Sequence, residues 1–546
     1  MMNWRIIWEN IMTIDFLYCN MDKNNFYIGR ISQVYRDNSI AQVENLSLLS
    51  QRKMLNEFLV PSTINYFVII DSVQGIFLGE VFQSKVSSTV NLHDSINRGK
   101  PELVFPEINI DIIGLMTHHD KKFKLPEFKT VGVADKVYLA NQNAIEIYMG
   151  SIEINNTQEK LLSTFATYLN MDDVEVSLKP STLFDHHFFV VGATNSGKST
   201  SALSILDKLV TADKKVLFID PTGEYNDSFS ETIVKKLSLG VDTAISPGKV
   251  SMQQWAMLFE TNSNTQSAVL ADAIQSLRYQ KKNNCSTYLR KAGENVNVIQ
   301  QKIASVSKSD TDFDISLLPE QIAAEAVAEP SKGVNYVYDT FRANANSYLV
   351  QKVNYQLSNT NFMTFFTQKQ GMTDLLYELY QFMHTPKSSL YINTSTLGAT
   401  EGIGGMIIDL ICNFIIEQKD TCPFVFFIDE VHRYTKSQYS ESEFHNGLTV
   451  VAREGRKKGI FLFLTSQNPQ DVSPVLLGQI GTILVHRLTH NDEIRAIQNH
   501  LDDFAIKQVK KLNQGEAILS SINLLQNIFI HITKCSRKQY NETPLL

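Results

Sequence analysis

The fold of this chain is decided by one stretch, Gly192-Ala193-Thr194-Asn195-Ser196-Gly197-Lys198-Ser199-Thr200. It lies between the apolar run Phe188 to Val191 and a segment with the pattern of a helix. A glycine-rich loop in that position presents backbone N–H groups and the positive end of a helix dipole to phosphate groups. We therefore predict that the whole loop binds a nucleotide, with Lys198 reaching the β- and γ-phosphates and Ser199 holding Mg²⁺.

Length and composition indicate a globular protein of several domains. The chain has 546 residues, too many for one compact core, and is 43% hydrophobic and 20% charged. Its net charge of −7 gives no general attraction to nucleic acid or to an acidic membrane. This argues against a protein that simply wraps DNA, but not against a ring that carries basic residues inside its pore.

The cysteines and the apolar segments predict a cytoplasmic protein. The five cysteines are widely scattered without a C-x-x-C pair, so we expect reduced thiols rather than disulfides or zinc. Arg5 and Glu9 interrupt the first twelve residues, which make a poor signal peptide. The strongest membrane candidate, Gly405 to Ile416, contains Asp409 and is too short to cross a bilayer.

The order of apolar runs predicts two domains. Residues 1–150 alternate short β-rich runs with turns, which is typical of a small β-barrel. After a polar connector from Gly150 to Lys179, residues 151–546 alternate buried strands and helices, as a mostly parallel α/β sheet requires. Long helical patterns at about 251–383 predict an inserted helical subdomain, and two β runs and a tail occupy about 512–546.

A second motif indicates what is done with the nucleotide. The apolar run Phe424 to Ile428 predicts a central strand that ends in Asp429-Glu430. Asp429 is expected to bind Mg²⁺ through water, and Glu430 to orient and deprotonate the attacking water. This pairing favours a hydrolase of the additional-strand P-loop class, and the lack of an N-K-x-D motif favours ATP over GTP. The simpler interpretation is that both carboxylates cap the next helix.

Two polar segments follow the acidic pair. Gln467 comes after the predicted strand Ile460 to Leu464, where it is expected to face the γ-phosphate, although such a segment is also typical of a plain turn. Arg456 lies in the basic stretch Arg453 to Gly459. That stretch is either ordinary helix capping or the source of an arginine finger for a neighbouring subunit. The spacing does not choose between Arg453 and Arg456 as the finger.

Together these motifs resemble the HerA branch of the HerA/FtsK ATPases. Beyond the phosphate loop, the shared elements are Asp220-Pro221-x-Gly223-Glu224-Tyr225, Asp429-Glu430-x-His432, Glu454-Gly455-Arg456-Lys457-x-Gly459, Ser466-Gln467-x-Pro469 and Arg487-Leu488. The barrel is similar to one that this family shares with ATP synthase subunits. The resemblance spans roughly residues 26–535 and implies a RecA-like α/β P-loop ATPase core.

The resemblance implies a homohexamer that hydrolyses ATP with Mg²⁺ at subunit interfaces and moves double-stranded DNA through a central channel, as a translocase or helicase. It also implies a partner on the barrel face: a nuclease of the NurA type or an antiviral-defence effector such as a sirtuin-type protein. Seven residues carry over by motif as catalytic: Lys198, Asp220, Glu224, Asp429, Glu430, Arg456 and Gln467.

Three positions depart from the family pattern. Asn195 stands where the family usually has Gly, and Asn tolerates a positive φ better than other residues with a side chain. Thr222 replaces a common His. His186 stands where relatives often place an Arg that reaches a neighbour, so hydrolysis is expected to be slow without a partner.

Two other functions stay open. In the first, the chain would be an ATP-regulated ring scaffold that assembles and activates a partner enzyme. In the second, it would be a conjugation or secretion ATPase. The barrel and the lack of a membrane segment count against the second. The adjacent histidines His118-His119 and His186-His187 point to opposite faces of an extended segment, so we expect no metal other than Mg²⁺.

Overall fold

The computed structural model describes residues 13–18, 21–36, 38–50, 53–54, 57–58, 64–86, 97–99, 104–154, 157–169, 174–262, 265–397, 401–435 and 447–539. The chain divides into two compact units. The first is Met1–Gln158 with Ser520–Ile528, and the second is Glu159–Leu519 with Phe529–Leu546.

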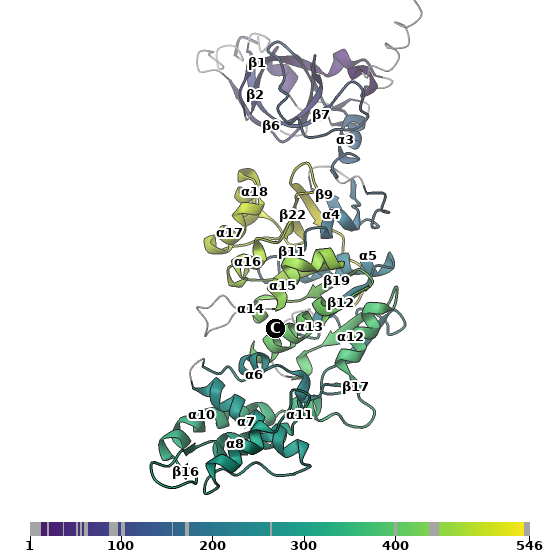
Figure 1. Cartoon of the computed structure of the whole chain (residues 1–546). Helices are drawn as coiled ribbons and strands as arrows, with labels where there is room; N and C mark the ends of the chain where they lie inside the picture. Colours follow the sequence, from purple (N-terminus) through teal and green to yellow (C-terminus); the bar gives the residue numbers. More distant parts are fainter. Residues whose placement is uncertain are drawn as a thin grey trace, which may run out of the picture. The chain divides into compact units, whose positions relative to one another are not determined.

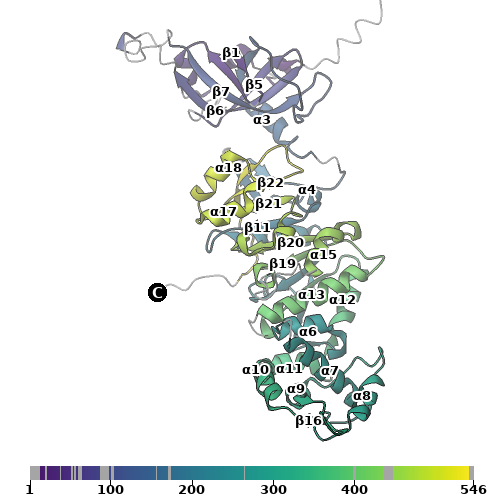
Figure 2. The same cartoon turned by 60° about the vertical axis from the view of Figure 1, so that its left-hand side comes forward.

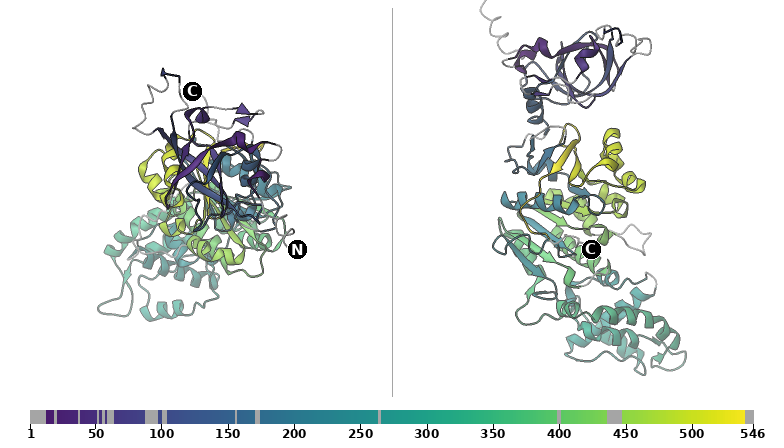
Figure 3. Two further views of the ribbon diagram at one scale, coloured as in Figure 1. Left: turned by 90° about the horizontal axis from the view of Figure 1, so that it is seen from above. Right: turned by 180° about the vertical axis from the view of Figure 1, so that it is seen from behind.

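The first unit contains a closed barrel of six antiparallel strands, which confirms the predicted N-terminal barrel (Figure 1; Figure 3). In the order of their neighbours around the barrel, the strands are β1 (Tyr27–Val34), β2 (Ser39–Val43), β7 (Pro106–Met116), β6 (Gly75–Val86), β5 (Phe67–Ser72) and β8 (Lys136–Leu139). Alternating apolar residues such as Ile28, Val68 and Ile108 fill its interior. The unit also holds the small hairpin β3 (Lys53–Met54) and β4 (Glu57–Phe58) and the helix α3 (Gln142–Met149).

The second unit is built on a sheet of eleven strands. The sheet runs in the order β10 (Glu175–Val176), β9 (Ala166–Tyr168), β23 (Ile528–Ile532), β22 (Glu516–Ser521), β21 (Thr482–Val485), β11 (Phe188–Val191), β20 (Ile460–Ser466), β19 (Phe424–Ile428), β12 (Val216–Asp220), β18 (Ser389–Asn393) and β13 (Val234–Ser238).

The central part of this sheet is parallel, as predicted. All pairs from β21 across to β13 run in the same direction. Every residue of β11, β12 and β19 is buried, which explains their continuous apolar sequences. Helix α5 (Lys198–Thr211) packs against β11, β12 and β20, so the phosphate loop joins the sheet to a buried helix.

Further helices surround the sheet in the second unit. They are α4 (Pro180–Phe184), α13 (Glu401–Glu417), α14 (His432–Thr435), α15 (Gly447–Glu454), α16 (Pro474–Leu477), α17 (Asn491–Ile497) and α18 (Asp503–Gln508).

The predicted helical insertion is present in the second unit. Figures 1 and 2 show α7 to α11 gathered together beyond the sheet. The helices are α6 (Met252–Leu258), α7 (Gln266–Lys282), α8 (Val296–Ala304), α9 (Leu318–Ala324), α10 (Thr340–Leu357), α11 (Thr360–Thr367) and α12 (Leu375–His384). This part also contains two sheets of two short strands each. They are β14 (Thr243–Ala244) with β17 (Thr373–Asp374), and β15 (Val327–Ala328) with β16 (Val337–Tyr338). Trp255 anchors this part, with ring centroids 5.8 Å from Phe259 and 5.0 Å from Phe366.

Two local predictions differ from the structure. The helical patterns predicted at about 251–383 are interrupted, because α9 ends at Ala324 and Val327–Ala328 pairs with β16 as a strand. The connector from Gly150 to Lys179 is not wholly irregular, because its strands β9 and β10 extend the edge of the sheet beside β23. Strands of two or three residues leave too short an alternation to be recognised in a sequence.

Candidate nucleotide site

The phosphate loop has the backbone that its sequence predicts. Gly197 has φ of 109° and directly precedes α5, while Asn195 has φ of 63°, in the left-handed region that its side chain tolerates. A Cβ on Gly192 would lie 2.4 Å from Oγ of Ser196 and 2.6 Å from Cβ of His486. The loop therefore needs its first glycine for space and its second for conformation.

A wall formed by Gln514 and Gly515, which we did not predict, supports the loop. The N–H of Gly515 donates to the carbonyl oxygen of Ser196 at 3.0 Å, and Nε2 of Gln514 donates to Oδ1 of Asn195 at 2.9 Å. On the other side of the loop, the N–H of Ala193 donates to the carbonyl oxygen of Arg487 at 3.0 Å. The loop is thus held by segments about three hundred residues away in sequence.

His486 lies under the loop as a buried neutral base. Its Nδ1–H donates to the carbonyl oxygen of Glu516 at 2.8 Å, and Nε2 accepts the hydroxyl hydrogen of Ser201 at 2.8 Å. Burial lowers the pKa of His486 to about 4, so the ring is neutral at neutral pH. It packs the loop against β22 without adding a charge beside the phosphate site.

The order of the strands brings the predicted site residues to one edge of the sheet. Strand β20 lies between β11 and β19, and all three are parallel. The phosphate loop follows β11, Asp429-Glu430 follow β19, and Gln467 follows β20. This is the additional-strand arrangement that the acidic pair predicted, with Gln467 between the loop and the carboxylates.

Glu430 is the centre of the contacts at this edge. Its Oε1 forms an ion pair with Nζ of Lys198 and accepts a hydrogen bond from Nε2 of Gln467 at 2.8 Å. Its Oε2 lies 3.2 Å from Nδ1 of His432. Burial alone raises the pKa of Glu430, but the contacts with His432, Lys198 and Gln467 outweigh it and hold that pKa below its usual range. Glu430 is therefore ionised.

Gln467 joins the carboxylate to the phosphate loop. While its Nε2 donates to Glu430, its Oε1 accepts a hydrogen bond from the hydroxyl of Thr194 at 2.9 Å. One side chain thus touches the loop that would hold the phosphates and the carboxylate that would activate water. This is the position in which a γ-phosphate sensor was predicted.

Thr465 holds both members of the acidic pair. Its hydroxyl donates to Oδ1 of Asp429 at 2.5 Å and accepts the N–H of Glu430 at 2.9 Å. Glu430 has φ of 47°, an unusual conformation for a residue with a side chain, and this bond helps to fix it. Burial raises the pKa of Asp429, with the charges of Glu430 and Asp220 adding to the effect and Lys198 opposing it.

Asp220 and Glu224, predicted near the catalytic centre, occupy different environments. Asp220 is fully buried and accepts backbone N–H groups of Thr222, Gly223 and Tyr225 at 2.8 to 2.9 Å, so it shapes the turn after β12. Glu224 is partly buried, and burial, then the charge of Asp220, raises the pKa of its carboxyl. The charges of Lys198 and Glu430 also act on this carboxyl, in opposite directions.

Ser199 and Thr200 lie in the first turn of α5, at the edge where β19 ends in Asp429. A serine hydroxyl and a carboxylate are oxygen donors of the kind that Mg²⁺ prefers. The predicted donor set therefore fits a magnesium ion that accompanies a nucleotide.

Arg456 lies at the opposite edge of the sheet. It precedes β20, whereas the phosphate loop follows the parallel strand β11. Seven residues of β20 separate the two edges, roughly 20 Å at the usual rise of a strand. His186 lies on the same edge, where burial and the charge of Arg456 lower the pKa of its ring. Arg456 is exposed and does not belong to its own chain's phosphate site.

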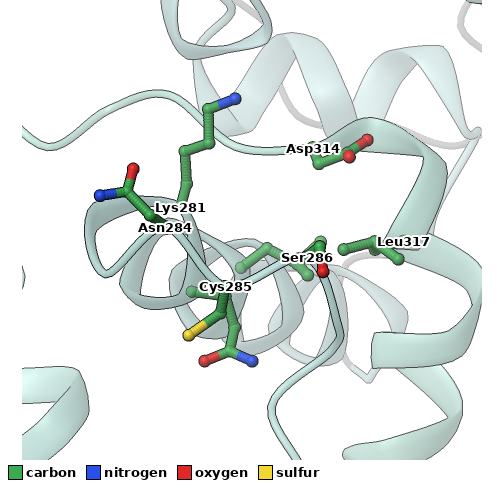
Figure 4. A pocket seen from close by; sticks show the side chains of 8 residues that line it. Lys281, Asn284, Cys285, Ser286, Asp314 and Leu317 are labelled. Atoms are coloured by element: carbon green, nitrogen blue, oxygen red, sulfur yellow. The ribbon is translucent and has the colours of Figure 1, made fainter.

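A cavity of about 270 Å³ opens in the helical insertion, away from these residues (Figure 4). Lys281 and Asp314 stand on different sides of it, and Cys285 lies at its wall. It includes no residue of the predicted nucleotide site. In the part of the chain that the structure describes, we find no helix with the length and apolar character needed to cross a membrane.

Part of the second unit is similar to one family of known proteins. Residues 165–413 match the family described as Helicase HerA, central domain. The chain is 21% identical to a probable helicase of Methanocaldococcus jannaschii, over 64% of this chain and 62% of that protein. It is 22% identical to the probable DNA double-strand break repair helicase HerA of the same organism, over 75% of this chain and 85% of that one. Among solved structures, VirB4 of Thermoanaerobacter pseudethanolicus aligns with 14% identity and a TM-score of 0.47, over 70% of this chain and 98% of that chain.

Proposed function

We propose that the chain is a HerA-type ATPase that couples ATP hydrolysis to movement along double-stranded DNA. The observation that carries the proposal is the set of contacts of Glu430. A carboxylate that touches both the P-loop lysine and a polar residue at the end of the intervening strand is placed to activate water against a γ-phosphate. The relatives are named as DNA double-strand break repair helicases, which supports DNA as the molecule along which the ATPase moves.

In this proposal each residue has one role. The backbone of the loop from Gly192 to Thr200 and Nζ of Lys198 bind the phosphates, and Ser199 and Asp429 hold Mg²⁺. The ion supplies charge neutralisation on the phosphate oxygens when it is bound. Glu430 takes the proton of the attacking water, and Gln467 responds to the γ-phosphate through its link to Thr194.

We further propose that the working form is a ring, a homohexamer as in the resemblance described above. Arg456 lies at the edge opposite to its own phosphate loop. A guanidinium there is useful to hydrolysis only in the site of a neighbouring copy, where it would stabilise the charge of phosphoryl transfer. A nuclease or an antiviral-defence effector that docks on the barrel is the partner that this arrangement would serve.

The test measures ATP hydrolysis with and without duplex DNA. We expect DNA to stimulate the wild type, and Lys198→Ala and Glu430→Gln to lose hydrolysis. Lys387→Ala is a matched control, because Lys387 pairs with Asp213 on the exposed surface. Full activity in both site variants would refute the assignment of the site. If DNA does not change the rate of ATP hydrolysis but a partner enzyme raises it, the ring-scaffold function is favoured instead.

A further inference from the structure

His187 lies directly before β11, at the edge of the sheet opposite to the phosphate loop. Its side chain is fully buried, and its φ of 59° is uncommon for a residue with a side chain. The N–H of His187 donates to the carbonyl oxygen of Phe184 at 3.1 Å, and its carbonyl oxygen accepts the N–H of Thr482 at 3.2 Å. Such a conformation persists only where the surroundings fix it, and here α4 and β21 do so.

Both nitrogens of the His187 ring form hydrogen bonds with the backbone of other elements. Burial lowers the pKa of His187 to about 4, so the ring is neutral and carries one hydrogen. Nδ1 accepts the N–H of Leu462, in β20, at 3.0 Å, so the hydrogen is on Nε2. Nε2–H donates to the carbonyl oxygen of Ala452, in α15, at 2.9 Å. One side chain thus links the last turn of α15 to β20.

The ring joins both ends of the segment that contains Arg456. This segment, residues 453–461, lies between the two backbone groups that His187 contacts and includes the 3-10 turn η8 (Gly455–Lys458). The N–H of Gly459 donates to the carbonyl oxygen of Arg456 at 3.1 Å. Arg456 is exposed. The segment is therefore a short turn with fixed ends and an exposed arginine.

An arginine that acts in the site of another copy depends on its own chain for its position. Displacing a reacting group by about 1 Å can lower the rate of a reaction about 100-fold. Both hydrogen bonds of the His187 ring are buried, so water does not replace the ring when it is removed. The ring is thus suited to fix the segment from which Arg456 extends.

We propose that His187 is a positioning residue that holds residues 453–461 so that Arg456 reaches the phosphate site of a neighbouring copy. This inference rests on the proposed ring and on the role of Arg456 in it. The four residues of β11 separate His187 from its own phosphate loop. Loss of the ring should therefore impair the site of the neighbour rather than nucleotide binding by its own chain.

The first test measures ATP hydrolysis and nucleotide binding in the full-length protein. His187→Phe fills most of the space of the ring but removes both hydrogen bonds, so kcat should fall about 100-fold. Binding of a fluorescent ATP analogue should stay unchanged, because the phosphate loop is intact. Phe184→Leu is the matched control and should keep kcat. It loosens the packing against Phe188 and Phe463 at the same edge but leaves both hydrogen bonds of the His187 ring.

Mixing of subunits separates positioning from a general loss of stability. Subunits with His187→Phe keep their phosphate loop, and subunits with Lys198→Ala keep a correctly placed Arg456. After the two are unfolded and refolded together, the mixture should regain a measurable fraction of the wild-type rate. A mixture of His187→Phe with Arg456→Ala should not, because every interface then lacks a correctly placed arginine. A variant that is only unstable would behave alike in both mixtures.

The inference is overturned by a wild-type kcat in His187→Phe, by loss of nucleotide binding in it, or by equal behaviour of its two mixtures. Arg456→Ala mixed with Lys198→Ala tests the ring itself. If that mixture does not recover, the proposed ring fails, and the inference falls with it. Should His187→Phe not fold, His187→Gln takes its place. It keeps a donor for the Ala452 carbonyl but not the acceptor for Leu462, and it should show a smaller fall in kcat with the same pattern of recovery.

Discussion

The hydroxyl of Thr465 donates a hydrogen bond of 2.5 Å to Oδ1 of Asp429, on the neighbouring strand. The same oxygen accepts the N–H of Glu430, so one side chain on β20 holds both acidic residues at the end of β19. Thr465 is fully buried, and water cannot replace it. The acidic pair therefore depends on a residue of the intervening strand.

Replacing this hydroxyl should weaken both the fold and the site. In Thr465→Val, the Asp429 carboxylate and the Glu430 N–H lose a buried partner, which should cost about 1–3 kcal/mol of the free energy of unfolding. ATP hydrolysis should fall with it. Thr465→Ser keeps the oxygen and is the control. Denaturant unfolding and ATPase assays check this, and equal stability of the Val and Ser variants would contradict it.

The ion pair between Lys198 and Glu430 should stabilise the empty protein. Both side chains are less than 10% exposed. Lys198→Met leaves a buried carboxylate without its counter-charge and should lower the free energy of unfolding by about 3 kcal/mol. Adding Glu430→Gln should restore part of this loss. Unfolding of the two single variants and the double variant measures the coupling, and a strictly additive result would show that the pair contributes nothing.

Stability should fall in mild acid because of two buried histidines. Burial lowers the pKa of His187 and of His486 to about 4, compared with 6.5 for an exposed ring. Between pH 6.5 and 4 the unfolded chain therefore binds more protons than the native one, so stability decreases as the pH falls through that window. The loss is up to about 3 kcal/mol for each ring. His486→Asn should flatten the pH dependence of unfolding, and an unchanged slope would contradict the assignment.

The phosphate loop should tolerate glycine at Asn195 but not a side chain at Gly197. Gly197 has φ of 109°, and a Cβ there would lie 3.0 Å from the backbone nitrogen of Gly515. Gly197→Ala should therefore abolish binding of a fluorescent ATP analogue. Asn195→Gly suits a φ of 63° and should bind normally, whereas Asn195→Val should not, because a β-branched residue is strained at positive φ. Normal binding by Gly197→Ala would show that the loop adapts.

Mixing two inactive variants tests whether Arg456 acts on a neighbour. Arg456→Ala keeps an intact phosphate site, and Lys198→Ala keeps an intact arginine. If the arginine acts across an interface, a mixture of the two should regain a measurable fraction of the wild-type hydrolysis rate, while each alone stays inactive. Lys457→Ala is a control for charge in the same exposed segment. If the two variants are unfolded and refolded together and ATP hydrolysis does not recover, Arg456 acts within its own chain or not at all.

The centre of this fold is predictable from sequence because its signals are local. A buried parallel strand is a continuous apolar run, so β11 and β19 were predicted with the bounds that the structure has. The phosphate loop was recognisable because its chemistry needs Gly and Lys at fixed spacing. The barrel strands alternate and are separated by turns, which is also a local pattern.

The supporting residues were not predictable, because distance along the chain separates them from what they support. Nothing around Thr465, His486 or Gly515 indicates that they contact Asp429, Ser201 and Ser196. A threonine in a strand, a histidine after one and a glycine in a turn are common. Only the pairing of β20 with β19 and of β21 with β11 gives them a role.

The wall formed by Gln514 and Gly515 also determines when the phosphate loop is completed during synthesis of the chain. During synthesis the phosphate loop emerges more than three hundred residues before the segment that closes it. A nascent chain that ends before this wall contains Lys198, both carboxylates and Gln467. Its phosphate loop still lacks the hydrogen bonds from Gln514 and Gly515. The ability to hold a nucleotide should therefore arise only after Gln514 and Gly515 have been synthesised, so that shorter nascent chains do not consume ATP.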